Sequence, residues 1–196
     1  MIFQTQRGQA IPTLTQVEAE RRKLARRRHR RSASLTFLLS FLITAMGGIL
    51  LLLMFLPVLE VSGGSMEPTL QDGDILVLCK PNAIRTGEMC GMYAQGRLIL
   101  KRVIALPGDV VDMDDGGNVY VNGTQLQEPY VSEKTLGNCD LSFPLTVPWN
   151  SLFVMGDHRE TSIDSRSSLI GCVSLDQVMG HVVARIWPLK SIGWLE

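Results

Sequence analysis

The sequence is poor in the residues and spacings that build several common functional sites. Its three histidines form no evident Ser-His-Asp arrangement. Its four cysteines have spacings that match no zinc-binding pattern, and none of them is placed like a nucleophile. No internal repeat is evident. A His-based catalytic triad and a zinc site are therefore disfavoured, and we expect neither a metal nor another cofactor.

The chain also has no net charge, but this total hides a strong asymmetry. Residues 1–31 contain nine Lys or Arg and two Glu, which gives this segment a charge of +7. The remaining residues contain ten Lys or Arg and seventeen Asp or Glu, which gives −7. Such an asymmetry indicates either a chain whose two parts lie in different compartments or a tail that binds nucleic acid.

A long uncharged segment decides between these two readings. Leu35–Leu59 contains 25 residues without a charge, and as a helix it would span about 37 Å, enough for a hydrocarbon core of about 30 Å. A cleavable signal peptide would have a shorter apolar region of about 7–15 residues. The basic cluster before the segment predicts that the N-terminus stays cytoplasmic and contacts anionic lipids. We therefore expect a cytoplasmic tail (1–34), a transmembrane anchor (35–59), an exported domain (60–196), a lipid bilayer as partner and no nucleic acid.

The pattern after Glu60 is typical of an all-β domain, because short apolar runs alternate with turn signals. Asn122-Gly123 is a pair typical of a hairpin turn. Residues 110–148 are rich in turns and predict an insertion or cap. If the domain is exported, the four cysteines could form disulfides, although buried thiols are at least as compatible with the sequence. The predicted strands are Leu59–Ser62, Ile75–Leu78, Glu88–Tyr93, Leu98–Ala105, Val110–Met113, Val119–Val121, Leu152–Met155 and Gly180–Ile186.

Two residues in this domain suggest hydrolytic chemistry. Ser65 follows two glycines, which allow the close backbone approach that a substrate carbonyl requires. Alone, it could equally belong to a linker. Lys101 lies in an apolar strand, where strand alternation places it on the same face as Ile99 and Val103. It is either a snorkelling edge residue or a buried amine whose lowered pKa makes it a general base.

Four segments occur in an order that resembles bacterial type I signal peptidases. They are GGSMEPTL at Gly63–Leu70, GDILV at Gly73–Val77, KRVIALPGD at Lys101–Asp109 and GDHRETSIDSR at Gly156–Arg166. Each segment alone is a weak signal, but all four behind an anchor form a strong one. The resemblance implies a mainly β fold, shared with self-cleaving repressor proteases, behind one N-terminal transmembrane helix. It also implies a serine endopeptidase that cleaves signal peptides from secretory preproteins.

The resemblance further implies roles for individual residues. Ser65 corresponds to the nucleophile and Lys101 to the general base. Ser162 corresponds to the hydroxyl that orients the lysine, and Asp164 and Arg166 to a supporting ion pair. Asp157 and Arg159 would brace the same turn, and His158 stands where many members carry Asn.

The oxyanion hole and the substrate pockets follow from the same segments. The backbone N–H of Ser65 is the expected first oxyanion donor, whereas the second donor is open because Gly63 stands where some members have serine. An extended peptide could add alongside Leu59–Gly63 as a further strand. The predicted walls of its pockets are Val61, Met66, Leu100 and Ile104, any of which could instead be core.

Two other classes of function compete with this prediction. A membrane-tethered scaffolding domain would not need both Ser65 and Lys101. A Ser/Lys self-cleaving repressor would need a DNA-binding domain where this chain has its uncharged segment. Class A β-lactamase chemistry is excluded because Pro68 stands where the S-x-x-K motif requires Lys.

Overall fold

The computed structural model describes residues 21, 34–50, 57–80 and 83–195. The chain divides into two compact units, Met1–Met54 and Phe55–Glu196. In the first unit, residues 34–50 form a helix with mostly exposed side chains. None of the helices in the described ranges is long and apolar enough to span a bilayer. Most of the predicted basic tail and residues 51–56 of the predicted anchor lie outside the described residues.

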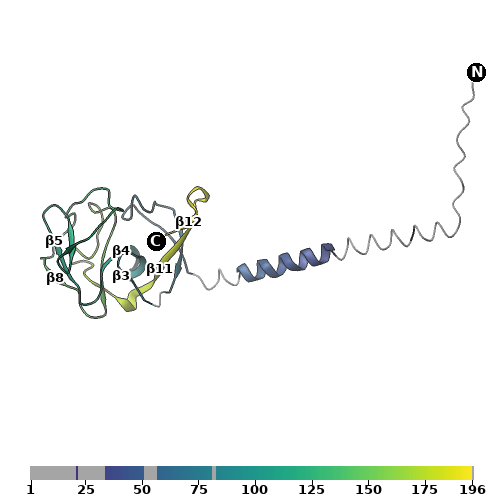
Figure 1. Ribbon diagram of the computed structural model, residues 1–196, viewed down its shortest axis with the longest axis horizontal. Coiled ribbons are helices and arrows are strands. Elements are labelled where there is room, and N and C mark those ends of the chain that lie inside the picture. The colour runs from purple at the N-terminus through teal and green to yellow at the C-terminus, as the bar shows by residue number, and fades with distance from the viewer. Residues whose placement is uncertain (1–20, 22–33, 51–56, 81–82, 196) are drawn as a thin grey trace, which may run out of the picture. The chain divides into compact units, whose positions relative to one another are not determined.

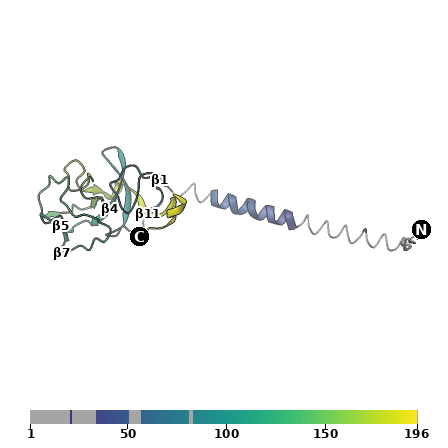
Figure 2. The same ribbon diagram turned by 90° about the horizontal axis from the view of Figure 1, so that it is seen from above.

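The second unit contains two antiparallel sheets. The first sheet has the order β1-β2-β11-β3-β4-β9-β10, with β12 pairing to β11, and the second has the order β7-β6-β5-β8. In both Figure 1 and Figure 2, β5 of the second sheet lies at one end of this unit, and β11 lies toward the other. The strands are β1 Val58–Glu60, β2 Ile75–Cys79, β3 Met89–Ala94, β4 Arg97–Ala105, β5 Val110–Met113, β6 Val119–Val121, β7 Thr124–Gln125, β8 Leu145–Thr146, β9 Ser151–Met155, β10 Val173–Ser174, β11 Val178–Trp187 and β12 Gly193–Trp194.

All eight predicted strands are present, with ends that differ by at most two residues. The hairpin at Asn122-Gly123 is also present, and both residues have the positive φ that its tight turn requires. The structure adds four strands of two residues each, β7, β8, β10 and β12. Val58 and Leu59 belong to β1 and pair with β2, although Leu59 was predicted as the end of the anchor.

Residues 110–146 form the second sheet, which is inserted between β4 and β9 of the first. Its buried side chains Val111 and Val119 pack with Ile104 and Phe153 of the first sheet. This apolar cluster joins the insertion to the main sheet, so burial of hydrophobic surface holds the two sheets together.

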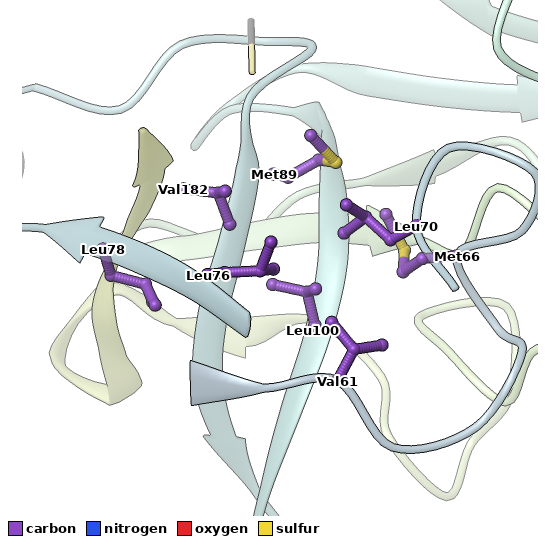
Figure 3. Close-up of a cluster of buried hydrophobic side chains, with 8 residues drawn as sticks. All are labelled: Val61, Met66, Leu70, Leu76, Leu78, Met89, Leu100 and Val182. Atoms are coloured by element: carbon purple, nitrogen blue, oxygen red, sulfur yellow. The ribbon is translucent and has the colours of Figure 1, made fainter. Parts of the chain in front are cut away.

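A second apolar cluster fixes the segment that carries Ser65. Val61, Met66 and Leu70 of this segment pack against side chains of four strands, as Figure 3 shows. These partners are Leu76 and Leu78 of β2, Met89 of β3, Leu100 of β4 and Val182 of β11. Because apolar anchors lie on both sides of Ser65 in the sequence, the serine is held against the sheet.

All four cysteines are free thiols in the structure. Cys90 is fully buried in β3, and burial, with a contribution from Glu88, raises its pKa to about 12. A thiol with this pKa stays protonated at neutral pH and is a poor nucleophile.

Candidate active site

Ser65 lies in a turn that is tied to the chain beyond it. The backbone N–H of Gly73 donates to the carbonyl of Val61 at 2.9 Å, and the N–H of Gly63 donates to Asp72 Oδ1 at 2.7 Å. Gly63 has φ +86°, a conformation that side chains rarely adopt. Gly63, two residues before Ser65, thus allows the sharp turn. Ser65 itself is half-buried.

Lys101 reaches this serine from β4. Its side chain is 4% exposed, and Nζ donates a hydrogen bond to Ser65 Oγ at 2.8 Å. Burial lowers the pKa of Lys101 from its ordinary value of 10.5 and outweighs the opposing effect of Asp164. The structure therefore places Lys101 as a buried amine beside a hydroxyl, and not as a snorkelling edge residue.

The turn after β9 packs directly on Ser65. The N–H of His158 donates to the carbonyl of Ser65 at 3.1 Å. A Cβ atom on Gly156 would lie 2.5 Å from that carbonyl oxygen and 2.3 Å from Ser162 Oγ. Such distances leave no room for a side chain, so glycine at 156 permits the close approach of the two segments.

Ser162, the predicted orienting hydroxyl, is fully buried on this turn. Its Oγ has no hydrogen-bond partner of ordinary geometry, and no hydrogen bond to Lys101 is present among the described residues. The structure therefore brings Ser162 into the site without showing the contact that the resemblance implies.

Asp164 and Arg166 form the predicted ion pair, and both side chains are fully buried. Arg166 donates to the Asp164 carboxylate through Nε and Nη2, each at 2.8 Å. Arg166 also donates to the carbonyls of Leu136 and Arg159 at 2.8 Å, which ties the insertion to this turn. Burial raises the pKa of Asp164, but Arg166, the N–H of Gly156 and the Ser162 hydroxyl together hold it below 3.8.

A second buried ion pair was not predicted. Arg102, the neighbour of Lys101, donates to Asp157 through Nε at 2.9 Å and through Nη2 at 2.6 Å. Thr69, from the Ser65 segment, donates to the same carboxylate at 2.6 Å. The Arg102 guanidinium lies 4.0 Å from the ring centre of Tyr130. This pair therefore links the strand of Lys101, the segment of Ser65 and the insertion.

The other predicted bracing residue, Arg159, pairs with Glu128 of the insertion. Both side chains are buried, and Arg159 Nε also donates to the carbonyl of Gly156 at 3.1 Å. The ring of His158 contacts Thr161, with 2.8 Å between Nδ1 and Oγ1. In the part of the chain that the structure describes, this ring makes no hydrogen bond with Ser65.

A hollow of about 120 Å³ opens beside Ser65 and Lys101. Three of the predicted pocket residues, Val61, Met66 and Leu100, line it. Ile104 does not line it. It lies four residues beyond Leu100, about 13 Å further along β4, and packs in the cluster with Val111 and Val119 of the insertion. Wall residues that were not predicted are Leu59, Glu60, Ser62, Leu98 and Ile99.

The described residues contain no group of three or more His, Cys, Asp or Glu side chains that could hold a metal ion. The site brings together a hydroxyl and a buried amine.

Comparison with known proteins identifies the family. A profile described as signal peptidase, peptidase S26, matches residues 34–187. The chain belongs to this family. It is 35% identical over 153 residues to signal peptidase I of Bacillus licheniformis, which covers 67% of this chain and 77% of that protein. It is 36% identical over 145 residues to signal peptidase I T of Bacillus subtilis (strain 168), with 67% and 74% covered.

A crystal structure of a signal peptidase I from Enterococcus faecalis V583 is also similar. It is 29% identical, covers 51% of this chain and 97% of that chain, and gives a TM-score of 0.42. The resemblance that the four sequence segments predicted is confirmed by the family profile and the Bacillus relatives.

The signal peptidase fold of this chain should depend on the buried pair of Asp164 and Arg166. Asp164→Ala or Arg166→Ala should each lower the free energy of unfolding by about 3–5 kcal/mol, because each leaves one buried charge unpaired. Urea unfolding at pH 7 measures this, with Asp115→Ala at an exposed turn as control. Because the pKa of Asp164 is depressed, its contribution is present above about pH 3.8 and is lost as the pH falls through its folded value. Parent-like unfolding of both variants would contradict the prediction.

Gly156→Ala should reduce the cleavage rate by about 100-fold, because the new Cβ displaces Ser65 from Lys101. The measurement is kcat/KM on a preprotein together with the melting temperature. Gly193→Ala is the matched control, since a Cβ there meets no atom within 4 Å. A Gly156→Ala enzyme with parent-like kcat/KM would show that the close approach is not needed.

Proposed function

We propose that this protein is a membrane-anchored serine endopeptidase that removes signal peptides from exported preproteins. Ser65 is the nucleophile and Lys101 is the general base. One observation carries the proposal, which is the 2.8 Å contact between Lys101 Nζ and Ser65 Oγ inside a buried site. The membership in the signal peptidase family gives the class of substrate.

The first chemical step is the activation of the serine. A neutral Lys101 amine accepts the Ser65 hydroxyl proton, and Oγ attacks the carbonyl carbon of the scissile bond. In this step Ser65 Oγ donates its proton to Lys101 Nζ, whereas in the resting site Nζ is the donor. Burial supports this step, because it lowers the pKa of Lys101 and increases the neutral fraction of the amine.

The attack places negative charge on the substrate oxygen. The backbone N–H of Ser65 donates no hydrogen bond within the described residues, and it is therefore available as an oxyanion donor. The second donor was left open by the sequence. Ser62 lines the hollow with an exposed side chain, which makes it a candidate although it is offset by one residue from the position where some members have serine. The Lys101 ammonium returns its proton to the leaving amine, and the acyl group remains on Ser65.

Hydrolysis then completes the cycle. Lys101 accepts a proton from water as the oxygen of that water attacks the acyl carbon, and the ester bond to Oγ then breaks. The Lys101 ammonium returns the proton to Ser65 Oγ, and the new carboxyl group of the signal peptide releases its own proton to solvent. The complete burial of Ser162, on the turn that packs on Ser65, supports a role in orienting the lysine through these transfers. Asp164 and Arg166 act through the turn that carries Ser162, and they are positioning residues.

The sheet offers a place for an extended substrate. Strand β9 pairs with β4 from Arg102 onward, and in the described chain no strand pairs with residues 97–101 on that side. The hollow beside Ser65 lies between this free edge and residues 59–62. A peptide that enters as an added strand gains backbone hydrogen bonds and sends alternate side chains into the hollow.

The uncharged segment 35–59 and the basic cluster before it support a single membrane anchor. In this arrangement residues 1–34 are cytoplasmic and residues 60–196 form the extracytoplasmic catalytic domain, with a cap around 110–148. The anchor would keep the site near the outer surface of the bilayer, where an inserted signal peptide ends.

Ser65→Ala and Lys101→Met should each reduce preprotein cleavage to the level of the double variant, because nucleophile and base act as a unit. The melting temperature of Lys101→Met should be equal to or higher than that of the parent, since the cost of burying an amine is removed. Lys190→Met, at an exposed lysine, is the control. Near-normal turnover by Lys101→Met would instead indicate His158 or His181 as the base.

The cleavage rate should rise with pH as Lys101 loses its proton. Because the pKa of Lys101 is lowered, the midpoint of this rise should lie below 10.5. The profile of kcat/KM between pH 5 and pH 11 measures it. A midpoint at or above 10.5 would contradict catalysis by a buried amine.

Cleavage should require small residues at the first and third positions before the scissile bond. These two side chains point together into a hollow of about 120 Å³ that Val61, Met66 and Leu100 already line. A larger side chain would displace packed walls at a cost of about 1–3 kcal/mol, which corresponds to a rate about 5- to 150-fold lower. A series with Ala, Val and Phe at each position tests this, with the second position as control. Equal rates for Phe and Ala at the first position would refute it.

External protease added to intact cells should digest the region after Glu60 and spare the first 30 residues, because the basic cluster holds the N-terminus inside. Tags at each end, detected after digestion, measure the outcome. Permeabilised cells, in which both ends become accessible, are the control. Protection of the region after Glu60 together with loss of the N-terminal tag would reverse the topology.

A further inference from the structure

An arginine that the proposed mechanism does not use lies against the segment that carries Ser65. Arg185 belongs to β11, and its side chain is 18% exposed. Its Nη1 donates to Asp74 Oδ2 at 2.7 Å, and the Asp74 side chain is 4% exposed. Because both groups are largely removed from water, this contact is stronger than a fully exposed salt bridge of the same length.

The segment that carries Ser65 is a loop with Asp74 at its base. The N–H of Val61 donates to the carbonyl of Asp74 at 2.8 Å. We call residues 62–73, which lie between these two residues, the serine loop. The Oδ2 atom of Asp74 also accepts a hydrogen bond from the N–H of Gln71 at 3.0 Å, inside the loop. The carboxylate that pairs with the arginine therefore shapes the end of the serine loop.

The same guanidinium also contacts the serine loop directly. Arg185 Nη1 donates to the carbonyl of Thr69 at 3.4 Å, and the Thr69 hydroxyl donates to Asp157. Asp157 is the partner of Arg102, the neighbour of Lys101. Hydrogen bonds thus run from Arg185 through Thr69 and Asp157 to the strand that carries the lysine.

A β-bulge in β11 turns Arg185 toward the serine loop. Val182 pairs with Leu78, and both side chains are buried in the cluster of Figure 3. Regular pairing would next place residue 184 opposite Leu76, which is buried in the same cluster. The register shifts by one residue, so that Arg185 is opposite Leu76 instead. A bulge of this kind re-aims a side chain, and here it brings the guanidinium to the loop.

The C-terminal turn holds Arg185 from its other side. Its Nε donates to the carbonyl of Ser191 at 2.9 Å, at the end of the short helix η2 (Leu189–Ser191). Strand β12 pairs with β11 at Gly193 and Arg185. Because the guanidinium is planar and its donors have fixed directions, these contacts together fix its position. Arg185 is therefore a fixed point against which the serine loop can be held.

We propose that Arg185 is a positioning residue, which holds the serine loop where Lys101 Nζ meets Ser65 Oγ. This inference rests on the proposed function. Arg185 is not among the residues that line the hollow beside Ser65, so it acts through Asp74 and Thr69 and not on the substrate. Without it the loop moves away from the sheet, which lengthens the contact between serine and lysine and lets water reach the amine.

The first test replaces Arg185 by Met, which keeps an apolar stem and removes every donor. In full-length enzyme in detergent, Arg185→Met should lower kcat on a preprotein about 100-fold, because a displacement of about 1 Å costs this much. The midpoint of the rise of kcat/KM with pH should also move up by about one unit, because water at Nζ restores part of the ordinary pKa of Lys101. The charged groups that act on Lys101, which are Asp164, Arg166 and Asp157, are unchanged in this variant.

A double variant separates positioning from stability. Arg185→Met leaves the Asp74 carboxylate buried without its cation, which by itself lowers the melting temperature. Addition of Asp74→Asn removes this charge and keeps an acceptor for the N–H of Gln71. The double variant should regain the melting temperature of the parent and keep the lowered kcat and the raised midpoint. Arg185→Lys should recover about tenfold in kcat, because its ammonium can bond to Asp74 but lacks the fork that also reaches Thr69.

The pH profile distinguishes this role from a merely structural one. Loss of folded enzyme lowers kcat equally at every pH and leaves the midpoint where it is. An unchanged midpoint in the folded double variant would therefore overturn the inference, and so would a parent-like kcat. Arg85→Met, at an exposed arginine, is the matched control and should keep both parent values. Absence of cleavage by the parent enzyme would contradict the proposed function instead.

Discussion

The site depends on keeping a lysine amine out of water and next to a hydroxyl. An ammonium group in this position would lose its hydration, so burial shifts Lys101 toward the neutral form. The apolar sheet produces this environment, since β4 places Lys101 among buried neighbours while Met66 and Leu70 press the Ser65 segment onto the same sheet. The core that folds the domain is therefore also the source of the apolar environment around the amine. In the proposed mechanism stability and reactivity oppose each other, because the buried amine costs stability wherever the unfolded chain would carry it protonated.

Three segments far apart in the sequence must meet at this point, and buried ion pairs join them. Asp157 accepts hydrogen bonds from Arg102 of β4 and from Thr69 of the Ser65 segment. Arg166 reaches from the turn after β9 to backbone carbonyls of the insertion. Buried ion pairs contribute little net stability compared with apolar packing. Removal of one partner nevertheless lowers the free energy of unfolding strongly, because the other charge stays buried without a partner. Their value here is geometric, since they fix the distance between the strand that carries the lysine and the turn that carries Ser162.

The sequence alone was sufficient to predict the main strands, because the alternation of apolar and polar residues and the turn residues between strands are local signals. The four strands of two residues were missed because long-range pairing defines them, as Val173 with Leu152 illustrates. Ser65 and Lys101 were predicted from motifs as nucleophile and base, and in the structure their side chains are in hydrogen-bond contact. The pair of Arg102 and Asp157 was missed because its partners are 55 residues apart and each looks like an ordinary charge in the sequence. Whether Ile104 is a pocket wall or core was left open by the sequence, because strand alternation puts it on the same face as Leu100 and does not reveal that the insertion packs over it.

The pairing of a buried acid with an arginine bears on why the pKa of Lys101 is lowered although two carboxylates lie nearby. Asp164 and Asp157 both raise the pKa of Lys101, and either carboxylate alone in a buried site would favour the ammonium form. Arg166 lowers that pKa, and it holds the Asp164 carboxylate in a two-point contact. The effect of Asp164 on the pKa of Lys101 is thus opposed by the arginine that is paired with it. What remains is the loss of water around Nζ, which is the largest influence on its pKa. Arg166 therefore does more than support the turn, because it acts in the same direction as burial on the pKa of Lys101.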